Sequence, residues 1–533
     1  MRILTASVKA SEGIAIGRAF VVTRGEAVAT EPKGSAEQEY SRFKEAVRLS
    51  VEQIDALVAV DEIFAAHLEM VQDEMLNDGV AAYIDDGCSA SDAVQRACQD
   101  IVAMLSEVDD DYLRERVDDV RDVCSRIVAN LTGGVQNPFE HLCDGDIIVD
   151  SLLTPSDMAL VDLEKVAGFV TKEGGATAHV CIIARNHSIA AVVGLHEVLD
   201  CVEHGDMLIV DGGEGVVIVN PDEETLSDYR ERRKAYEQRR EEQKSVSHIK
   251  VYDGENHIPV MANAGNIEEV QMAISQGADG IGLFRSEFLY MQSDKEPSEE
   301  QQYEAYAAAA KACQGAPLTI RTLDVGGDKA ISWLPFPKED NPFLGWRAIR
   351  VSLELQDMFR RQLRAILRTS AAGNVRVMFP MITSVTELRE AKKILEECKS
   401  ELREGSIPFS EDIKVGVMIE TPAAVFVASA LAQECDFFSI GTNDLTQYVM
   451  AADRGNSKVT SLYNPYADAV VEAVRQTIAA ARSAGIECGM CGEFASDSNA
   501  TRQLLDCGLQ EFSVNISSIG EIKSRLQEII SKR

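Results

Sequence analysis

A histidine at the start of an apolar helix is the first candidate for chemistry in this chain of 533 residues. His179 comes after the glycine pair Gly174 and Gly175, which follow a strand-like run that ends at Thr171. The free backbone N–H groups of a helix N-terminus favour an anion beside the imidazole ring. Histidine can also exchange a proton or a phosphoryl group at neutral pH. The segment favours a catalytic histidine, although a histidine that only caps and packs the helix fits the same pattern.

Polar residues with a shared chemical logic follow strand-like runs in the second half of the chain. They are Arg285, Arg321, Glu420, Asn443, Asp444, Cys491 and Glu493. The carboxylates Glu420 and Asp444 suit Mg²⁺, with substrate oxygens and water completing its shell. Arginine binds phosphate and carboxylate through paired hydrogen bonds, and a thiol such as Cys491 can move a proton. Each residue alone has a structural explanation, but together they predict a site for a small anion that carries phosphate and carboxylate.

The elements that position this second set are short apolar runs that alternate with amphipathic helices. The runs are 258–262, 280–284, 318–322, 375–379, 413–419, 437–440, 487–490 and 512–514. Eight such units predict a closed (β/α)8 barrel, in which catalytic residues lie at the carboxyl ends of the strands. A doubly wound open sheet is the alternative.

The first half of the chain predicts an α/β domain that is interrupted by helices. Strand-like runs occur at 13–17, 19–22, 147–149, 169–171, 208–210 and 216–219, with a short helix at 179–187. Between them the spacing of apolar residues predicts helices over 36–57, 61–77, 91–105 and 112–131. We expect the early strands to pair with the later ones, which makes the helical block an insertion.

Four regions follow from these patterns. The expected boundaries are 1–22 with 145–221 for the α/β domain, 23–144 for the helical domain, 222–250 for a helical linker and 251–533 for the barrel. The charged segment 222–244 has little apolar face, which is typical of a solvated connector that permits swivelling.

Composition restricts the partners and the compartment. A net charge of −35 at pH 7 disfavours nucleic acid and anionic membranes and favours a basic protein partner. The sequence has no apolar run long enough to span a bilayer, and its N-terminus lacks the apolar region of a secretory signal. Twelve scattered cysteines argue against a disulfide framework and favour reduced thiols in a cytoplasm.

Five longer motifs resemble those of one family. They are the segments 280–288 (GIGLFRSEF), 321–329 (RTLDVGGDK), 341–350 (NPFLGWRAIR), 441–448 (GTNDLTQY) and 489–493 (GMCGE). The family is phosphoenolpyruvate–protein phosphotransferase, Enzyme I of the bacterial sugar phosphotransferase system. The similarity runs from Gly13 to the C-terminus in the domain order of the family.

The resemblance implies a role for each candidate residue. His179 would take the phosphoryl group of phosphoenolpyruvate on Nε2 and pass it to a histidine of the carrier protein HPr. Cys491 would protonate the enolpyruvate carbon, and Glu420 with Asp444 would hold Mg²⁺. The implied substrate-binding residues are Arg285, Arg321, Arg347, Asn443, Asp444 and Arg454. The α/β domain would carry the phosphohistidine, the helical domain would bind HPr, the barrel would bind phosphoenolpyruvate, and the chain would form a homodimer through the barrel.

The chain departs from the family pattern mainly around the histidine. Ala176 and Ala178 stand where the family has an arginine and a hydroxyl, and Lys172 stands where an aspartate is common. Met158 replaces a threonine that hydrogen-bonds the active histidine in the family, and Ser496 replaces a glycine. We expect these changes to alter the orientation and the pKa of His179, and so to slow the phosphoryl transfer or change its coupling.

Acidic residues of the helical domain, including Glu62, Asp73 and Glu74, would suit a basic face of HPr. Each of them could equally be an ordinary solvated surface residue without a partner role.

Two other functions remain open from the sequence. Pyruvate phosphate dikinase and phosphoenolpyruvate synthase share the phosphohistidine and barrel modules, but they need a large nucleotide-binding domain that segment 23–144 is too short to form. A divergent paralogue without catalysis could instead bind phosphoenolpyruvate or HPr as a regulator.

Overall fold

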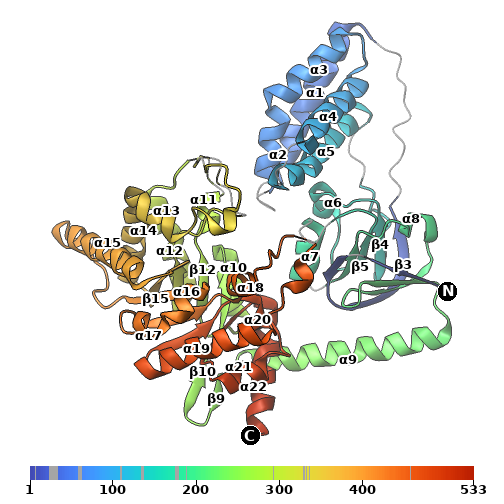
Figure 1. Ribbon diagram of the computed structural model, residues 1–533. Coiled ribbons are helices and arrows are strands. Elements are labelled where there is room, and N and C mark those ends of the chain that lie inside the picture. The colour runs from blue at the N-terminus through green and yellow to red at the C-terminus, as the bar shows by residue number, and fades with distance from the viewer. Residues whose placement is uncertain are drawn as a thin grey trace. The chain divides into compact units, whose positions relative to one another are not determined.

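The computed structural model divides into two compact units, Met1–Gln238 and Arg239–Arg533 (Figure 1). It describes residues 1–6, 8–22, 34–57, 63–107, 111–133, 137–174, 179–187, 189–291, 293, 295–327, 331, 333–334, 336–456 and 458–533. Each unit is described by itself.

The first unit contains an eight-stranded sheet whose strand order is β1-β8-β7-β3-β4-β5-β6-β2. Its central strands β3, β4, β5 and β6 pair in parallel, and the remaining pairs are antiparallel. The strands are β1 (Arg2–Thr5), β2 (Val8–Ser11), β3 (Ile14–Val21), β4 (Asp146–Asp150), β5 (Val166–Thr171), β6 (Ala190–Val193), β7 (Met207–Asp211) and β8 (Val216–Val219). The early strand β3 pairs with β4 and β7, as the sequence predicts.

Alternating apolar side chains give this sheet two buried faces. Ile148 and Phe169 belong to one buried cluster and Val149 and Val170 to another, because successive residues of a strand point to opposite sides. Residues of α6 (Pro155–Leu160) and α7 (His179–His187) pack in the first cluster. Helix α8 (Val198–Cys201) packs in the second. In the chain, α7 follows β5 and leads into β6.

Among the described residues between β3 and β4, five helices bury their own apolar cluster. They are α1 (Ala36–Asp55), α2 (Ile63–Gln72), α3 (Glu74–Asp85), α4 (Ala90–Glu107) and α5 (Asp111–Leu131). The expected insertion is confirmed, but the single helix expected over 61–77 is wrong. Asp73 ends it, because the Asp73 side chain accepts a hydrogen bond from the backbone N–H of Met75 and caps a new helix.

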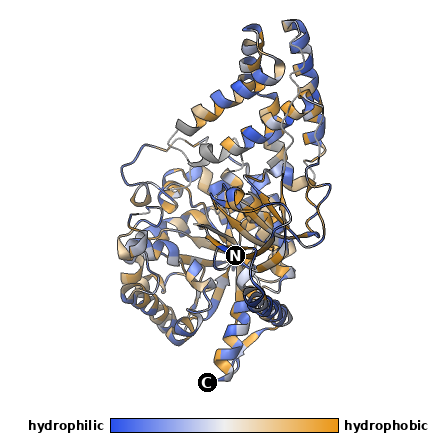
Figure 2. Ribbon diagram, turned by 90° about the vertical axis from the view of Figure 1, so that its right-hand side faces the viewer, coloured by the Kyte–Doolittle hydropathy of each residue, from blue (hydrophilic) through white to orange (hydrophobic). Residues whose placement is uncertain are grey.

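Helix α9 (Glu223–Ser247) follows the sheet and is mostly hydrophilic (Figure 2), although Leu226 near its start packs with Ile209 and Ile218. The boundary between the two compact units falls inside this helix. The finer domain boundaries given above remain a prediction.

Eight parallel strands in the second unit form a closed barrel, so the open-sheet alternative is wrong. The strands are β11 (Val260–Ala264), β12 (Ile281–Arg285), β13 (Leu318–Arg321), β14 (Val375–Phe379), β15 (Lys414–Ile419), β16 (Phe437–Ile440), β17 (Glu487–Met490) and β18 (Glu511–Val514). A hairpin of β9 (Val251–Asp253) and β10 (Asn256–Ile258) precedes them.

Helices follow the barrel strands and cover them. They are α10 (Ile267–Ser275), α11 (Glu287–Met291), α12 (Glu299–Ala312), α13 (Ile349–Glu354), α14 (Gln356–Ser370), α15 (Val385–Glu404), α16 (Pro422–Phe426), α17 (Ala428–Leu431), α18 (Thr442–Met450), α19 (Asp468–Ala484), α20 (Glu493–Ser496), α21 (Thr501–Cys507) and α22 (Ile519–Ser531). Short 3₁₀ helices occur at η1 (Pro342–Leu344), η2 (Thr460–Leu462) and η3 (Ile516–Ser518).

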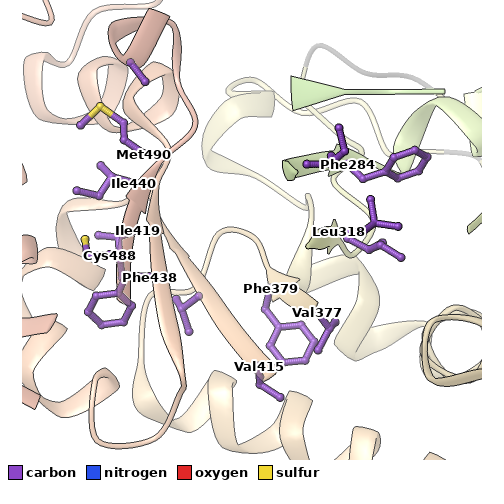
Figure 3. Packing of buried hydrophobic residues seen from close by; sticks show 14 of the residues in the cluster. Phe284, Leu318, Val377, Phe379, Val415, Ile419, Phe438, Ile440, Cys488 and Met490 are labelled. Carbon is purple, nitrogen blue, oxygen red and sulfur yellow. The ribbon is translucent and has the colours of Figure 1, made fainter. Parts of the chain in front are cut away.

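Strand residues that pack with these helices form one large buried cluster, part of which Figure 3 shows for β12 to β17. A second, smaller buried cluster contains other residues of the barrel strands. They include Leu283, Met378, Met418 and Phe437. The barrel interior is therefore filled by side chains, and its chemistry is confined to the strand ends.

We predict that Gly17→Ala destabilises the first unit. A Cβ at Gly17 would lie 2.0 Å from the carbonyl oxygen of Gly145, so β3 would have to move away from the turn before β4. The expected loss is about 3 kcal/mol of unfolding free energy, measured by chemical denaturation. Gly213→Ala is the control, because its added Cβ meets Asp211 only at an ordinary 3.5 Å. Equal stability of the two variants would contradict the prediction.

Candidate active site at the carboxyl end of the barrel

The parallel barrel brings most of the predicted residues to one rim, because the carboxyl ends of all eight strands meet there. Arg285 and Arg321 are the last residues of β12 and β13. Glu420 follows β15 directly, and Cys491 follows β17. Asn443 and Asp444 lie in the first turn of α18, which follows β16.

Two buried arginines form the centre of an ion-pair network. Arg321 Nη2 donates to Glu287 at 2.5 Å, and Arg321 Nη1 lies 2.8 Å from Asp324. Arg347 Nη2 lies 3.1 Å from Asp324, and Arg347 Nη1 lies 3.3 Å from Asp444. Burial works against both guanidinium charges, but the surrounding carboxylates outweigh it and raise the pKa of each arginine.

Glu287, Asp324 and Tyr448 belong to this site although the sequence patterns did not single them out. The Tyr448 hydroxyl accepts from Arg347 Nη1 at 3.2 Å and donates to the carbonyl of Phe343. The sequence could have pointed to Glu287 and Asp324. Each lies two or three residues after a strand-end arginine, inside a motif that was already recognised by its arginine.

Three arginines at this rim have a buried Nε donor without an acceptor among the described residues, as Arg376 does at the amino end of β14. The Nε atoms of Arg285, Arg321 and Arg347 are buried and have no hydrogen-bond partner within the described part of the chain. Arg285 also lies over the ring of Phe288 at 4.9 Å and 3.9 Å from a Glu269 oxygen. A buried donor without an acceptor is costly, so these atoms are suited to phosphate or carboxylate oxygens.

The carboxylates at this rim suit a divalent cation. Glu420 is 1% exposed and accepts from the backbone N–H of Met381 at 2.6 Å. Its pKa is raised to about 8, first by burial and then by the charges of Asp444 and Asp324. A cation would relieve this gathering of like charges. Among the described residues no three His, Cys, Asp or Glu side chains could hold a metal alone, so oxygens of a ligand would have to complete its shell.

Asn443 and Arg454 lie close to the same elements. The Asn443 amide oxygen accepts from the backbone N–H of Glu493 at 2.9 Å, which links the start of α18 to the residues after β17. The backbone N–H of Arg454 donates to the side chain of Gln447 at 3.1 Å. The substrate contacts assigned to Asn443 and Arg454 remain predictions.

Cys491 is a buried thiol at the end of β17. Its Sγ lies 3.8 Å from the carbonyl oxygen of Ile440, and burial raises its pKa to about 11. Cys488 and Cys491 have a C-x-x-C spacing, but Cys488 lies within β17 and Cys491 directly after it, and they belong to different buried clusters. All twelve cysteines are free thiols in this structure.

The predicted phosphoryl-accepting histidine belongs to the other unit. The backbone of His179 begins α7, but its side chain lies outside the described residues, as do Ala176 and Ala178. Met158 is buried in the same cluster as Val180 and Cys181 of α7, so an apolar side chain packs against this helix.

Of the acidic residues proposed for the helical domain, Asp73 and Glu74 are exposed, and Glu62 lies outside the described residues. Within the described chain, no helix has the length and apolarity that crossing a membrane requires.

We predict that iodoacetamide labels Cys143 long before Cys491. A thiol with a pKa near 11 has roughly one molecule in a few thousand ionised at pH 7.5, and only the thiolate reacts. Cys143 is exposed. Mass spectrometry of the two peptides over time checks this. Labelling in guanidinium is the control, and equal rates in the native protein would contradict the buried, protonated thiol.

Comparison with known proteins identifies the family. Three families match: the PEP-utilising enzyme N-terminal domain over residues 7–116, the mobile domain over 142–215 and the PEP-binding domain over 239–530. The phosphoenolpyruvate-protein phosphotransferase of Priestia megaterium is 41% identical, covering 98% of this chain and 93% of its own. The protein of that name from Haemophilus influenzae is also 41% identical, with 99% and 94% covered. This chain therefore belongs to the phosphoenolpyruvate-protein phosphotransferase family of PEP-utilising enzymes.

Proposed function

We propose that this chain moves the phosphoryl group of phosphoenolpyruvate to its own His179 and then to a histidine of HPr. As a member of the family, the chain is a phosphotransferase that uses phosphoenolpyruvate. The observation that carries the proposal is the buried network of Arg321 and Arg347 with carboxylates from separate barrel elements. Such a network suits a small substrate that carries both phosphate and carboxylate.

Phosphoryl transfer depends on positioning and on neutralising charge more than on covalent help. The residues proposed to hold phosphoenolpyruvate are Arg285, Arg321, Arg347, Asn443, Asp444 and Arg454. The buried Nε donors of Arg285, Arg321 and Arg347 support this role, because substrate oxygens would supply the acceptors that they lack within the described residues. Donors fixed before the substrate arrives need no reorganisation during the reaction.

Glu420 and Asp444 are proposed to hold Mg²⁺. The raised pKa of Glu420, caused by burial and then by Asp444 and Asp324, supports a cation at this point. When bound, Mg²⁺ supplies positive charge beside the phosphate and the departing enolate oxygen. Arg321 and Arg347 contribute to the same neutralisation from the protein side.

Cys491 is proposed to give a proton to the enolate carbon. A pKa raised to about 11 keeps the thiol protonated at neutral pH, which is the form that an acid requires. The charge of Arg321 acts on the thiol in the opposite sense to burial and would stabilise the thiolate left after transfer.

The remaining assignments concern partners and compartment. We propose that the helical domain binds HPr, that α9 lets the histidine domain reach both the barrel and HPr, and that the barrel forms the homodimer. The exposed acids Asp73 and Glu74 support a basic partner face. Free thiols throughout the chain support a reducing cytoplasm.

Incubation with ³²P-labelled phosphoenolpyruvate and Mg²⁺ tests the function. We expect acid-labile label on the wild-type chain, chase of that label to added HPr, and no label on His179→Gln. His187→Gln is the matched control, because His187 is an exposed histidine of the same helix. Label that never reaches His179 would favour a regulator that only binds its ligand. A requirement for ATP would favour the dikinase and synthase class.

We predict that Met158→Thr raises the rate at which His179 is phosphorylated. A threonine hydroxyl would add the hydrogen bond to the histidine that is found in the family, with an expected gain of roughly 3- to 10-fold. Met158→Val is the matched control, since valine has the size of threonine without the hydroxyl. Rapid-quench measurement with labelled phosphoenolpyruvate compares them, and equal rates would refute a role for this position in tuning His179.

A further inference from the structure

Asp324 bridges two buried arginines of the barrel site, yet none of the roles proposed above belongs to it. Its Oδ2 lies 2.8 Å from Arg321 Nη1, and its Oδ1 lies 3.1 Å from Arg347 Nη2. The residue is 1% exposed. A single carboxylate therefore joins guanidinium groups that come from β13 and from the segment before α13.

Each arginine is also held on its other side. Arg321 is held by Glu287 at 2.5 Å, and Arg347 is held by Asp444 at 3.3 Å and by Tyr448 at 3.2 Å. The charges alternate along the series Glu287, Arg321, Asp324, Arg347 and Asp444. A planar guanidinium with acceptors on two sides is fixed in both position and rotation.

The bridge takes Nη donors and leaves the Nε donors unused. Arg321 Nε and Arg347 Nε are buried and have no hydrogen-bond partner within the described chain. Two guanidinium groups that share one carboxylate repel each other, and this repulsion is strong where water is excluded. The carboxylate between them offsets this repulsion and fixes their separation.

We propose that Asp324 is a positioning residue for phosphoenolpyruvate, which sets the spacing and orientation of Arg321 and Arg347 before the anion binds. Asp324 acts through the two arginines and makes no contact with the substrate itself. The inference rests on the proposed function, because it concerns the same site.

The test is a calorimetric titration of phosphoenolpyruvate with Mg²⁺ into the full-length chain. His179→Gln serves as the parent, because it prevents phosphoryl transfer during the titration. Asp324→Asn in that parent keeps the side-chain shape, removes the charge and turns an NH₂ group toward the donors of one arginine. We expect the dissociation constant to rise roughly 100-fold, as for loss of one partner of a buried charge pair.

Glu511→Gln is the matched control. Glu511 is a carboxylate of the same barrel, 3.8 Å from Arg376, and both lie at the amino ends of their strands. This change should leave the dissociation constant within about twofold of the parent. If Asp324→Asn does not fold, Asp324→Glu keeps the charge but moves the two arginines, and an increase of roughly 10-fold is expected.

A double-mutant cycle shows whether Asp324 acts through Arg347. Once Arg347→Lys has removed the bridged Nη donors, Asp324→Asn should raise the dissociation constant by less than about 10-fold further. Additive effects would overturn the positioning role, as would a folded Asp324→Asn that binds within threefold of the parent. Failure of the parent itself to bind phosphoenolpyruvate would instead count against the proposed function.

Discussion

Burial of two positive charges is the constraint on which the barrel site depends. Arg321 and Arg347 are nearly inaccessible to water, and an unpaired buried charge costs several kcal/mol. The compensating carboxylates come from α11, from the loop after β13 and from α18, which are far apart in the chain. The ion pairs therefore hold together side chains from separate elements at one rim of the hydrogen-bonded barrel. A barrel closed at this rim presents its arginines in one fixed arrangement.

The arginines of the rim suggest how a strongly acidic protein can hold an acidic substrate. The net charge of −35 repels a phosphate and carboxylate ligand at long range. Within the site, Arg285, Arg321 and Arg347 keep buried donors, and the raised pKa of Glu420 marks a point where negative charges crowd together. A cation beside Glu420 would balance the negative charge there, and anion oxygens beside the arginines would accept from their unpaired donors. Substrate and metal thus suit the site better together than either does alone.

The proposed phosphoryl acceptor, His179, belongs to a different scaffold. In the first unit, β5, α7 and β6 form a parallel unit in which α7 begins beyond a strand end, and its backbone donors there lack helical partners. The apolar Met158 packs with residues of this helix, at the position where the family resemblance implies a hydrogen-bonding threonine. The departures expected from the family resemblance lie mainly in the segments before His179 in the sequence, and the five barrel motifs keep the residues that carry the resemblance.

The sequence by itself determined the barrel, the inserted helices and most of the candidate residues at the rim. Those features are local: alternation within strands, spacing along helices, and polar residues placed after apolar runs. The pattern of apolar residues predicted one helix over 61–77, but the Asp73 side chain caps a new helix within this segment. Only the tertiary structure decided that Asp324 bridges two arginines and that Cys488 and Cys491 diverge. These relations arise when the barrel closes, because closure places residues from distant segments in contact at distances that no sequence spacing encodes.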